Sequence, residues 1–162
     1  MVYLISLWGF AMRILGVRAA PKVASFVVYC NEDGTLKCVD VIKIPLTLST
    51  PEKLKYVRNN ILDILREYNV SIACIRISES NSQNLNIERL YIEGVIQEAF
   101  SSSNVKSYYT LRKQGIYSRI GISASEFEDA IKGKLKVRGV DTSLYDTSTN
   151  EAILAALAVG DA

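Results

Sequence analysis

The N-terminal part of the chain constrains the fold most, because it contains three runs of strand-forming residues joined by short turns. Residues 13–18 and 22–30 are rich in β-branched and other apolar residues, and Ala19-Ala20-Pro21 separates them. Asp33-Gly34 is the signal of a tight hairpin, and residues 36–44 follow with period-two alternation. The sequence therefore predicts three antiparallel strands at the start of the domain.

Helices and strands alternate after this hairpin. Thr50-Pro51 predicts a helix start, with Thr as N-cap and Pro in the first helical position, and apolar residues recur at helical spacing as far as Tyr68. Residues 70–77 are almost continuously apolar, which is typical of a strand that is buried on both faces after a helical crossover. A polar loop over residues 78–84 leads to a second helix, and residues 105–111 predict a fifth strand.

The second helix contains a glycine, which costs roughly 1 kcal/mol of helix stability relative to alanine. We therefore expect Gly94 to allow a close approach to the sheet. The side of this helix predicted to face the sheet carries Ile87, Leu90, Tyr91, Gly94, Val95 and Ala99.

The last helix is predicted from a capping box, Ser148-Thr149-Asn150-Glu151, followed by residues 152–158, which are apolar on most sides of a helix. Capping alone would explain both the type and the position of Glu151. A function for this carboxylate therefore competes with a purely local role.

Composition excludes several classes of site. The formal net charge of +2 gives no global attraction to nucleic acid or membrane, so any basic surface must be local. The chain has no histidine, and its three cysteines form no CxxC pair, so the common zinc sites and the Ser-His and Cys-His nucleophile systems are excluded. Any catalysis would have to use carboxylates, Lys, Tyr or a bound cation. We expect a cytoplasmic protein, and for this reason we do not expect a disulfide between Cys30 and Cys38.

Residues 1–11 are apolar, but they are too few to span a bilayer and lack the basic region of a secretory signal. We interpret them as an extension that lengthens the first strand, covers a hydrophobic edge, or contacts a second copy or another protein. Residues 12–162 are expected to form one domain, and Met12 offers an alternative start. We expect no membrane partner.

Three antiparallel strands, helix, strand, helix, strand and then terminal helices is an order that resembles the ribonuclease H-like superfamily, and within it the RuvC resolvase branch and small uncharacterised families related to it. The resemblance implies an α/β fold with a mixed five-stranded sheet, three strands antiparallel and then two parallel, flanked by helices. The matching segments are Arg13-Ile-Leu-Gly-Val-Arg18, Ala73-Cys-Ile-Arg76, Ile92-Glu-Gly-Val-Ile96 and Asn150-Glu-Ala-Ile-Leu-Ala-Ala-Leu-Ala158.

The resemblance also implies an active site in which carboxylates hold two divalent cations on either side of a phosphodiester. The aspartate of the first strand falls on Arg18, the acid of the fourth strand falls on or beside Arg76, and the acid of the last helix falls on Glu151. Two of these three positions have reversed charge, and an arginine cannot bind Mg²⁺. The resemblance therefore implies a degenerate nuclease, with no metal or other cofactor expected.

Two interpretations of the arginines remain open: Arg18, Arg76 and Glu151 form a structural ion-pair cluster, or the arginines hold a phosphate or another anion. The enzyme alternative is a Mg²⁺- or Mn²⁺-dependent nuclease whose acids are Glu79, Asp146 and Glu151. For Glu79 and Asp146, a solvated loop residue and a capping residue are the competing interpretations.

The C-terminal third is locally basic, with tyrosines at positions 108, 109 and 117 between the cations. Cations and aromatic rings together suit a phosphate backbone with stacked bases. Our leading hypothesis is a non-catalytic or weakly catalytic domain that binds nucleic acid, DNA or RNA, with an interaction or assembly module as another alternative. The residues predicted to bind the anion or nucleic acid are Arg18, Arg76, Arg112, Lys113, Arg119, Lys134, Lys136 and Arg138.

Overall fold

The three predicted N-terminal strands form one side of a single five-stranded sheet in the computed structural model, which describes residues 12–161. The strand order is β3-β2-β1-β4-β5, with β1–β2 and β2–β3 antiparallel and β1–β4 and β4–β5 parallel. This mixed sheet confirms the predicted fold class. The strands are β1 (Arg13–Ala19), β2 (Val23–Cys30), β3 (Thr35–Lys43), β4 (Ile72–Arg76) and β5 (Ser107–Leu111).

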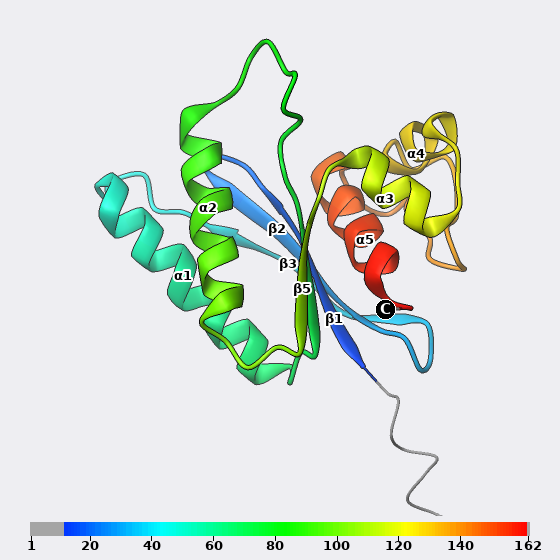
Figure 1. Ribbon diagram of the computed structural model, residues 1–162, viewed down its shortest axis with the longest axis horizontal. Helices are drawn as coiled ribbons and strands as arrows, with labels where there is room; N and C mark the ends of the chain where they lie inside the picture. Colours follow the sequence, from blue (N-terminus) through cyan, green and yellow to red (C-terminus); the bar gives the residue numbers. More distant parts are fainter. Residues whose placement is uncertain (1–11, 162) are drawn as a thin grey trace, which may run out of the picture.

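The helices cover both faces of the sheet (Figure 1). One face packs against α1 (Thr50–Glu67) and α2 (Ile87–Ser101), and the other packs against α3 (Lys113–Ile120), α4 (Ala124–Ile131) and α5 (Thr147–Val159). Among the described residues, no helix combines the length and apolar character needed to cross a membrane. The predicted extension over residues 1–11 lies outside the described residues.

Helix α5 rests directly on β1 at a glycine. A Cβ on Gly16 would lie 2.0 Å from the carbonyl oxygen of Ala152 and 2.9 Å from Cβ of Ala156. Both distances are shorter than real Cβ contacts, so only glycine allows the helix to pack this closely. Helix α5 is in turn buried on all sides from Thr149 to Val159, which agrees with its apolar sequence.

The prediction that Gly94 provides the close approach was wrong, because a Cβ added there would meet nothing within 4 Å. The predicted face of α2 was largely wrong as well, because Ala99 is its one buried member. The helix carries apolar residues around its whole circumference, so its sequence does not define one buried stripe. Its buried residues are Ile92, Glu93, Ile96, Ala99 and Phe100, while Ile87, Leu90 and Tyr91 are exposed.

The start of α5 also differs from its prediction. Asp146 is the N-cap, and its side chain accepts a hydrogen bond of 2.8 Å from the backbone N–H of Thr149. The helix therefore begins before Ser148, and the predicted capping box does not form. Glu151 consequently has no capping role and is available for contacts with the sheet.

Candidate functional site

Period-two alternation places Arg18 and Arg76 side by side on the sheet. Arg18 ends the same β1 face as Ile14 and Gly16, and Arg76 ends the same β4 face as Ile72 and Cys74. The two arginines are direct partners in the parallel register of β1 and β4. Their guanidinium groups therefore meet at the carboxyl edge of the parallel strands, where ligands bind in open α/β sheets.

Glu151 provides the negative charge between these cations. Its Oε2 lies 3.0 Å from Nε of Arg18 and 3.2 Å from Nε of Arg76, with the Arg76 side chain only 7% exposed and the Glu151 side chain 11% exposed. The structure thus forms the predicted ion-pair cluster. The distances are those of ion pairs, but neither N–H points at the carboxylate, so Nε of Arg76 and Oε2 of Glu151 have no hydrogen-bond partner among the described residues.

Burial disfavours the charged forms of the side chains in this cluster. Desolvation lowers the pKa of the Arg18 guanidinium and the nearby charges of Arg76 and Arg89 lower it too, whereas the Glu151 and Glu93 carboxylates raise it. Removing one partner from a buried ion pair commonly costs about 3–5 kcal/mol, because the remaining charge is left uncompensated. The cluster therefore constrains which substitutions the site can accept.

A second buried carboxylate, Glu93 of α2, was not predicted. Its Oε1 accepts hydrogen bonds of 2.6 Å and 2.8 Å from the backbone N–H and the hydroxyl of Ser78, and it lies 3.7 Å from Nη1 of Arg18. No sequence signal identifies it, because the stripe that Glu93 shares with Ile96 and Phe100 is selected by the packing of α2 and not by the pattern of its residues.

Glu79 connects the β4–α2 loop to the start of α3. Its Oε1 accepts a 3.0 Å hydrogen bond from the backbone N–H of Lys113 and lies 3.2 Å from Nη1 of Arg76. Arg112 donates from Nε to the carbonyl oxygen of Ser78 over 3.1 Å. The structure thus brings Glu79, Arg112 and Lys113 together with the two strand-end arginines.

A pocket of about 140 Å³ opens beside this cluster, between the β4–α2 loop and the first turn of α2. Arg89 joins Arg18 and Arg76 in its wall. Nε of Arg89 is buried without a hydrogen-bond partner, and no ion pair of this side chain occurs within residues 12–161. The polar part of the wall also includes Ser78, Glu79, Ser82, Asn84 and Asn86.

Other predicted site residues lie elsewhere. The carboxylate of Asp146 caps α5, and the Arg119 guanidinium stacks 4.8 Å from the ring centroid of Tyr109. Arg138 donates to the carbonyl oxygen of Leu157 and pairs with Asp161 at 2.7 Å, at the end of α5 opposite to Glu151. Lys134 and Lys136 are exposed on the segment between α4 and α5. Arg138, at the far end of α5, is therefore separated from the cluster.

The described residues do not fit a pair of divalent cations at the carboxyl edge. Guanidinium groups lie within 3.2 Å of both Glu79 and Glu151, and the third proposed acid, Asp146, is committed to its helix cap. No group of three or more Cys, Asp or Glu side chains in residues 12–161 is arranged to hold a metal ion. A metal ligand needs free oxygen lone pairs about 2 Å from the ion, and cations already occupy that space.

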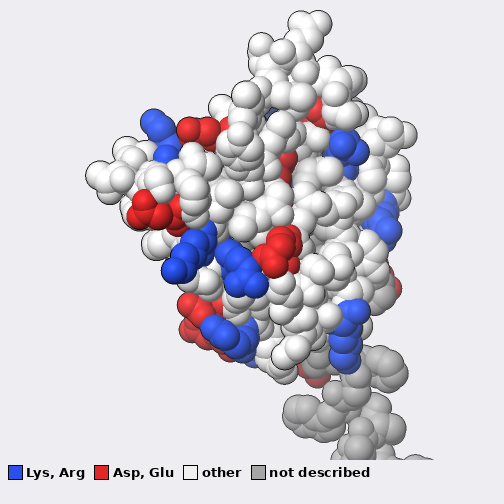
Figure 2. Space-filling view, turned by 60° about the vertical axis from the view of Figure 1, so that its left-hand side comes forward, with Lys and Arg blue, Asp and Glu red and all other residues white. Residues whose placement is uncertain are grey.

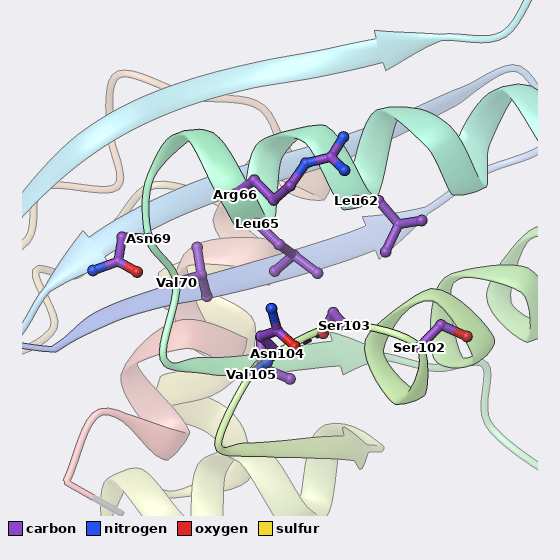
Figure 3. Close-up of a pocket in the computed structure, with 9 residues that line it drawn as sticks. All are labelled: Leu62, Leu65, Arg66, Asn69, Val70, Ser102, Ser103, Asn104 and Val105. Carbon is purple, nitrogen blue, oxygen red and sulfur yellow. Dashed lines mark hydrogen bonds between the residues drawn. The ribbon is translucent and has the colours of Figure 1, made fainter.

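A larger hollow of about 330 Å³ lies at the opposite, amino edge of the parallel strands (Figure 3). Leu62 and Leu65 of α1 line it on one side and residues 102–105 line it on the other, and Figure 3 shows the Arg66 guanidinium turned away from that segment. Arg66 is exposed and pairs with Asp63 on its own helix. This hollow has the larger volume, but its charged lining residue, Arg66, is exposed and already paired. We therefore place the candidate site at the carboxyl edge.

The face formed by α1 and α2 carries charges of both signs (Figure 2). Arg58 pairs with Glu98 across the two helices at 2.6 Å, and Arg66 pairs with Asp63. Exposed pairs of this kind contribute roughly 0–1 kcal/mol each. The face has no single-sign field that would attract a polyanion.

The fold resembles that of solved structures of RuvC and of a Holliday junction resolvase. The chain superposes on Thermus thermophilus RuvC in complex with a Holliday junction substrate with a TM-score of 0.70 and 15% identity, over 91% of each chain. A second T. thermophilus RuvC structure gives 0.69 and 12%, over 91% of this chain and 92% of that one. The yeast mitochondrial Holliday junction resolvase Ydc2 gives 0.58 and 11%, over 93% of this chain and 79% of that one.

The chain has the RuvC-like form of the ribonuclease H-like fold. No protein-family model matches the sequence, and no curated protein matches it. The similarity is therefore one of structure, and it covers almost the whole chain, whereas the chemistry at the carboxyl edge has to be inferred from this chain's own residues.

Proposed function

We propose that this domain binds nucleic acid at the carboxyl edge of β1, β4 and β5 and does not assemble a two-metal nuclease site there. The observation that carries the proposal is the pairing of Arg18 and Arg76 with Glu151 at the strand ends where the resemblance implies metal-binding carboxylates. Cations at this position attract phosphate but cannot activate water as a metal ion does. The fold similarity to resolvases that act on Holliday junctions supports nucleic acid as the ligand class.

Contacts beside the cluster support the same proposal. Arg112 and Lys113 have exposed side chains and lie directly after β5, next to Ser78 and Glu79. Together with Arg18, Arg76 and Arg89 they would place several cations along one edge of the sheet, which suits a backbone with regularly spaced negative charges. Such contacts position nucleic acid without reading its sequence.

The test uses labelled four-way junction, duplex and single-stranded DNA and RNA, incubated with the domain at low and moderate salt with Mg²⁺ or Mn²⁺. Binding is measured first, and the same samples are then run on a denaturing gel. Salt-sensitive binding with intact strands is the expected result, because contacts to phosphates release counterions. Absence of binding to every substrate would overturn the proposal.

The relocated-carboxylate nuclease is the competing outcome of the same gel. Cleavage by the wild-type domain that disappears in Glu151→Gln, purified in parallel, would establish that alternative. Because Glu151 also compensates two buried arginines, the folding of the variant is checked by circular dichroism. The assembly module stays a prediction that depends on residues 1–11.

A further inference from the structure

We propose that the pocket of about 140 Å³ beside the cluster binds a phosphate group directly through guanidinium groups, without a divalent cation. The proposal deepens the proposed function by naming the chemical group that the carboxyl edge recognises. It rests on that function only for the origin of the phosphate in a nucleic acid.

Unused donor capacity in the pocket wall points to an anion. Arg89 has no carboxylate partner among the described residues, and its Nε is buried without a hydrogen bond. Arg76 lines the pocket as well, and its Nε lies beside the Glu151 carboxylate at 3.2 Å. A buried donor without a hydrogen bond lowers the stability of the fold, and more so when the group is charged. A ligand that accepts a hydrogen bond from Arg89 would recover that free energy.

The first turn of α2 adds a second source of positive potential. The helix has 15 residues and starts at the pocket, where the Asn86 side chain accepts a hydrogen bond of 2.9 Å from the backbone N–H of Arg89. The N–H groups of Ile87 and Glu88 are free of partners within the helix, as in any first turn. Helix N-termini favour anions for this reason, and here Arg89 extends from the same turn.

Glu79 is the carboxylate in the pocket wall, and it would repel an anion if it were free. Its Oε1 already lies 3.2 Å from Nη1 of Arg76 and accepts the N–H of Lys113. Arg18, Arg76 and Arg89 therefore line the pocket together with one compensated acid, and Glu93 and Glu151 are not among its lining residues. Arg89 is the lining arginine without a carboxylate partner among the described residues, so it is the group that an anion would neutralise.

The size of the pocket limits what can enter. Pockets that enclose drug-sized molecules measure about 300–1,000 Å³. A volume of about 140 Å³ is too small for a nucleoside but is suited to a phosphate group. Arginine forks match the oxygens of a phosphate in bidentate geometry. The pocket is therefore selective for phosphate and indifferent to the base.

The direct test measures the melting temperature of the full chain in EDTA as inorganic phosphate replaces chloride at constant ionic strength. We expect phosphate to raise the melting temperature of the wild type, and Arg89→Gln to weaken phosphate binding at least tenfold by isothermal calorimetry. Arg89→Lys keeps the charge but loses the fork, so it should fall between the two. Arg66→Gln is the matched control and should behave as wild type, because Arg66 lies at the amino edge.

The proposed phosphate site would be overturned if phosphate did not raise the melting temperature of the wild type, or if it raised that of Arg89→Gln equally. Circular dichroism checks that the variants are folded. A response that requires Mg²⁺ would overturn the claim that guanidinium groups suffice.

Oligonucleotides with and without a 5′-phosphate distinguish a strand terminus from an internal phosphate. Tighter binding of the phosphorylated strand that is lost in Arg89→Gln assigns the pocket to a terminus. Equal binding of both strands, weakened in Arg89→Gln, assigns it to the internal backbone. Arg89-dependent phosphate binding without any nucleic-acid binding would keep the pocket and overturn the proposed function. Nucleic-acid binding that is equal in wild type and Arg89→Gln, without a phosphate response, would overturn the phosphate pocket and keep the proposed function.

Discussion

The two edges of the parallel strands both carry a hollow, but they differ in what lines it. The hollow at the amino edge is larger, about 330 Å³, and is lined by Leu62, Leu65 and polar loop residues. Its arginine, Arg66, is exposed and pairs with Asp63. The carboxyl edge has about 140 Å³, walled by Arg18, Arg76 and Arg89. At the carboxyl edge, buried polar atoms remain without hydrogen-bond partners. Unsatisfied buried charge thus marks a candidate site better than volume does.

The largest expected effect tests whether ion pairs stabilise the carboxyl edge. Glu151→Ala should lower the free energy of unfolding by about 3–5 kcal/mol, because two buried guanidinium groups lose their shared carboxylate. Urea denaturation measures this change. At the amino edge, Arg66→Ala breaks an exposed pair and should change stability by no more than about 1 kcal/mol. Equal losses in the two variants would remove the distinction between the edges.

The next effect separates packing from charge at the carboxyl edge. Gly16→Ala should lower the free energy of unfolding by about 1–3 kcal/mol or more, because the added Cβ meets the backbone of α5 and must displace the helix that holds Glu151. Gly94→Ala, the matched glycine variant, should raise stability by about 0.5–1 kcal/mol, since its Cβ enters open space within a helix. Thermal melts measure the expected fall in melting temperature for Gly16→Ala and the expected rise for Gly94→Ala. A stabilising Gly16→Ala would contradict the close packing of α5 on β1.

The smallest expected effect concerns binding and rests on the proposed function. Arg112→Ala should weaken nucleic-acid binding several-fold at moderate salt and reduce the slope of log affinity against log salt by about 1, as for one lost phosphate contact. Fluorescence anisotropy over a salt series measures both quantities. Arg66→Ala should leave the slope unchanged, because its charge lies at the other edge. If Arg66→Ala weakened nucleic-acid binding as much as Arg112→Ala, the binding surface would extend over both edges.

The positions of the strands along the chain could be predicted because each strand has a local signal. The Asp33-Gly34 hairpin predicts antiparallel strands and the apolar run of β4 predicts a strand after a helical crossover, whereas the mixed sheet followed from the resemblance. Arg18 and Arg76 could be placed together for the same reason, since parallel strand ends meet at one edge. Their contact with Glu151 followed from the resemblance, and the ion pairs agree with it.

Helix α2 could not be oriented, because apolar side chains surround it and the packing of the whole domain selects the buried stripe. For this reason Glu93 was missed and Gly94 was assigned the close approach that belongs to Gly16. The start of α5 depended on a choice between two polar N-caps two residues apart, Asp146 and Ser148. That choice is decided by which side chain reaches a free N–H, and a single sequence does not contain this geometry.

The position of α5 also has a consequence for folding. The helix fills one side of the core and contacts β1 and β2, and the Asn31 side chain reaches the carbonyl oxygen of Gly160 across 129 residues of sequence. Contacts between residues so far apart require closure of a long loop before they stabilise the chain. During synthesis, the apolar α5 side of β1 and β2 therefore stays uncovered until the last of the described helices has left the ribosome, and we expect slow folding with a stage at which chaperones can bind this face.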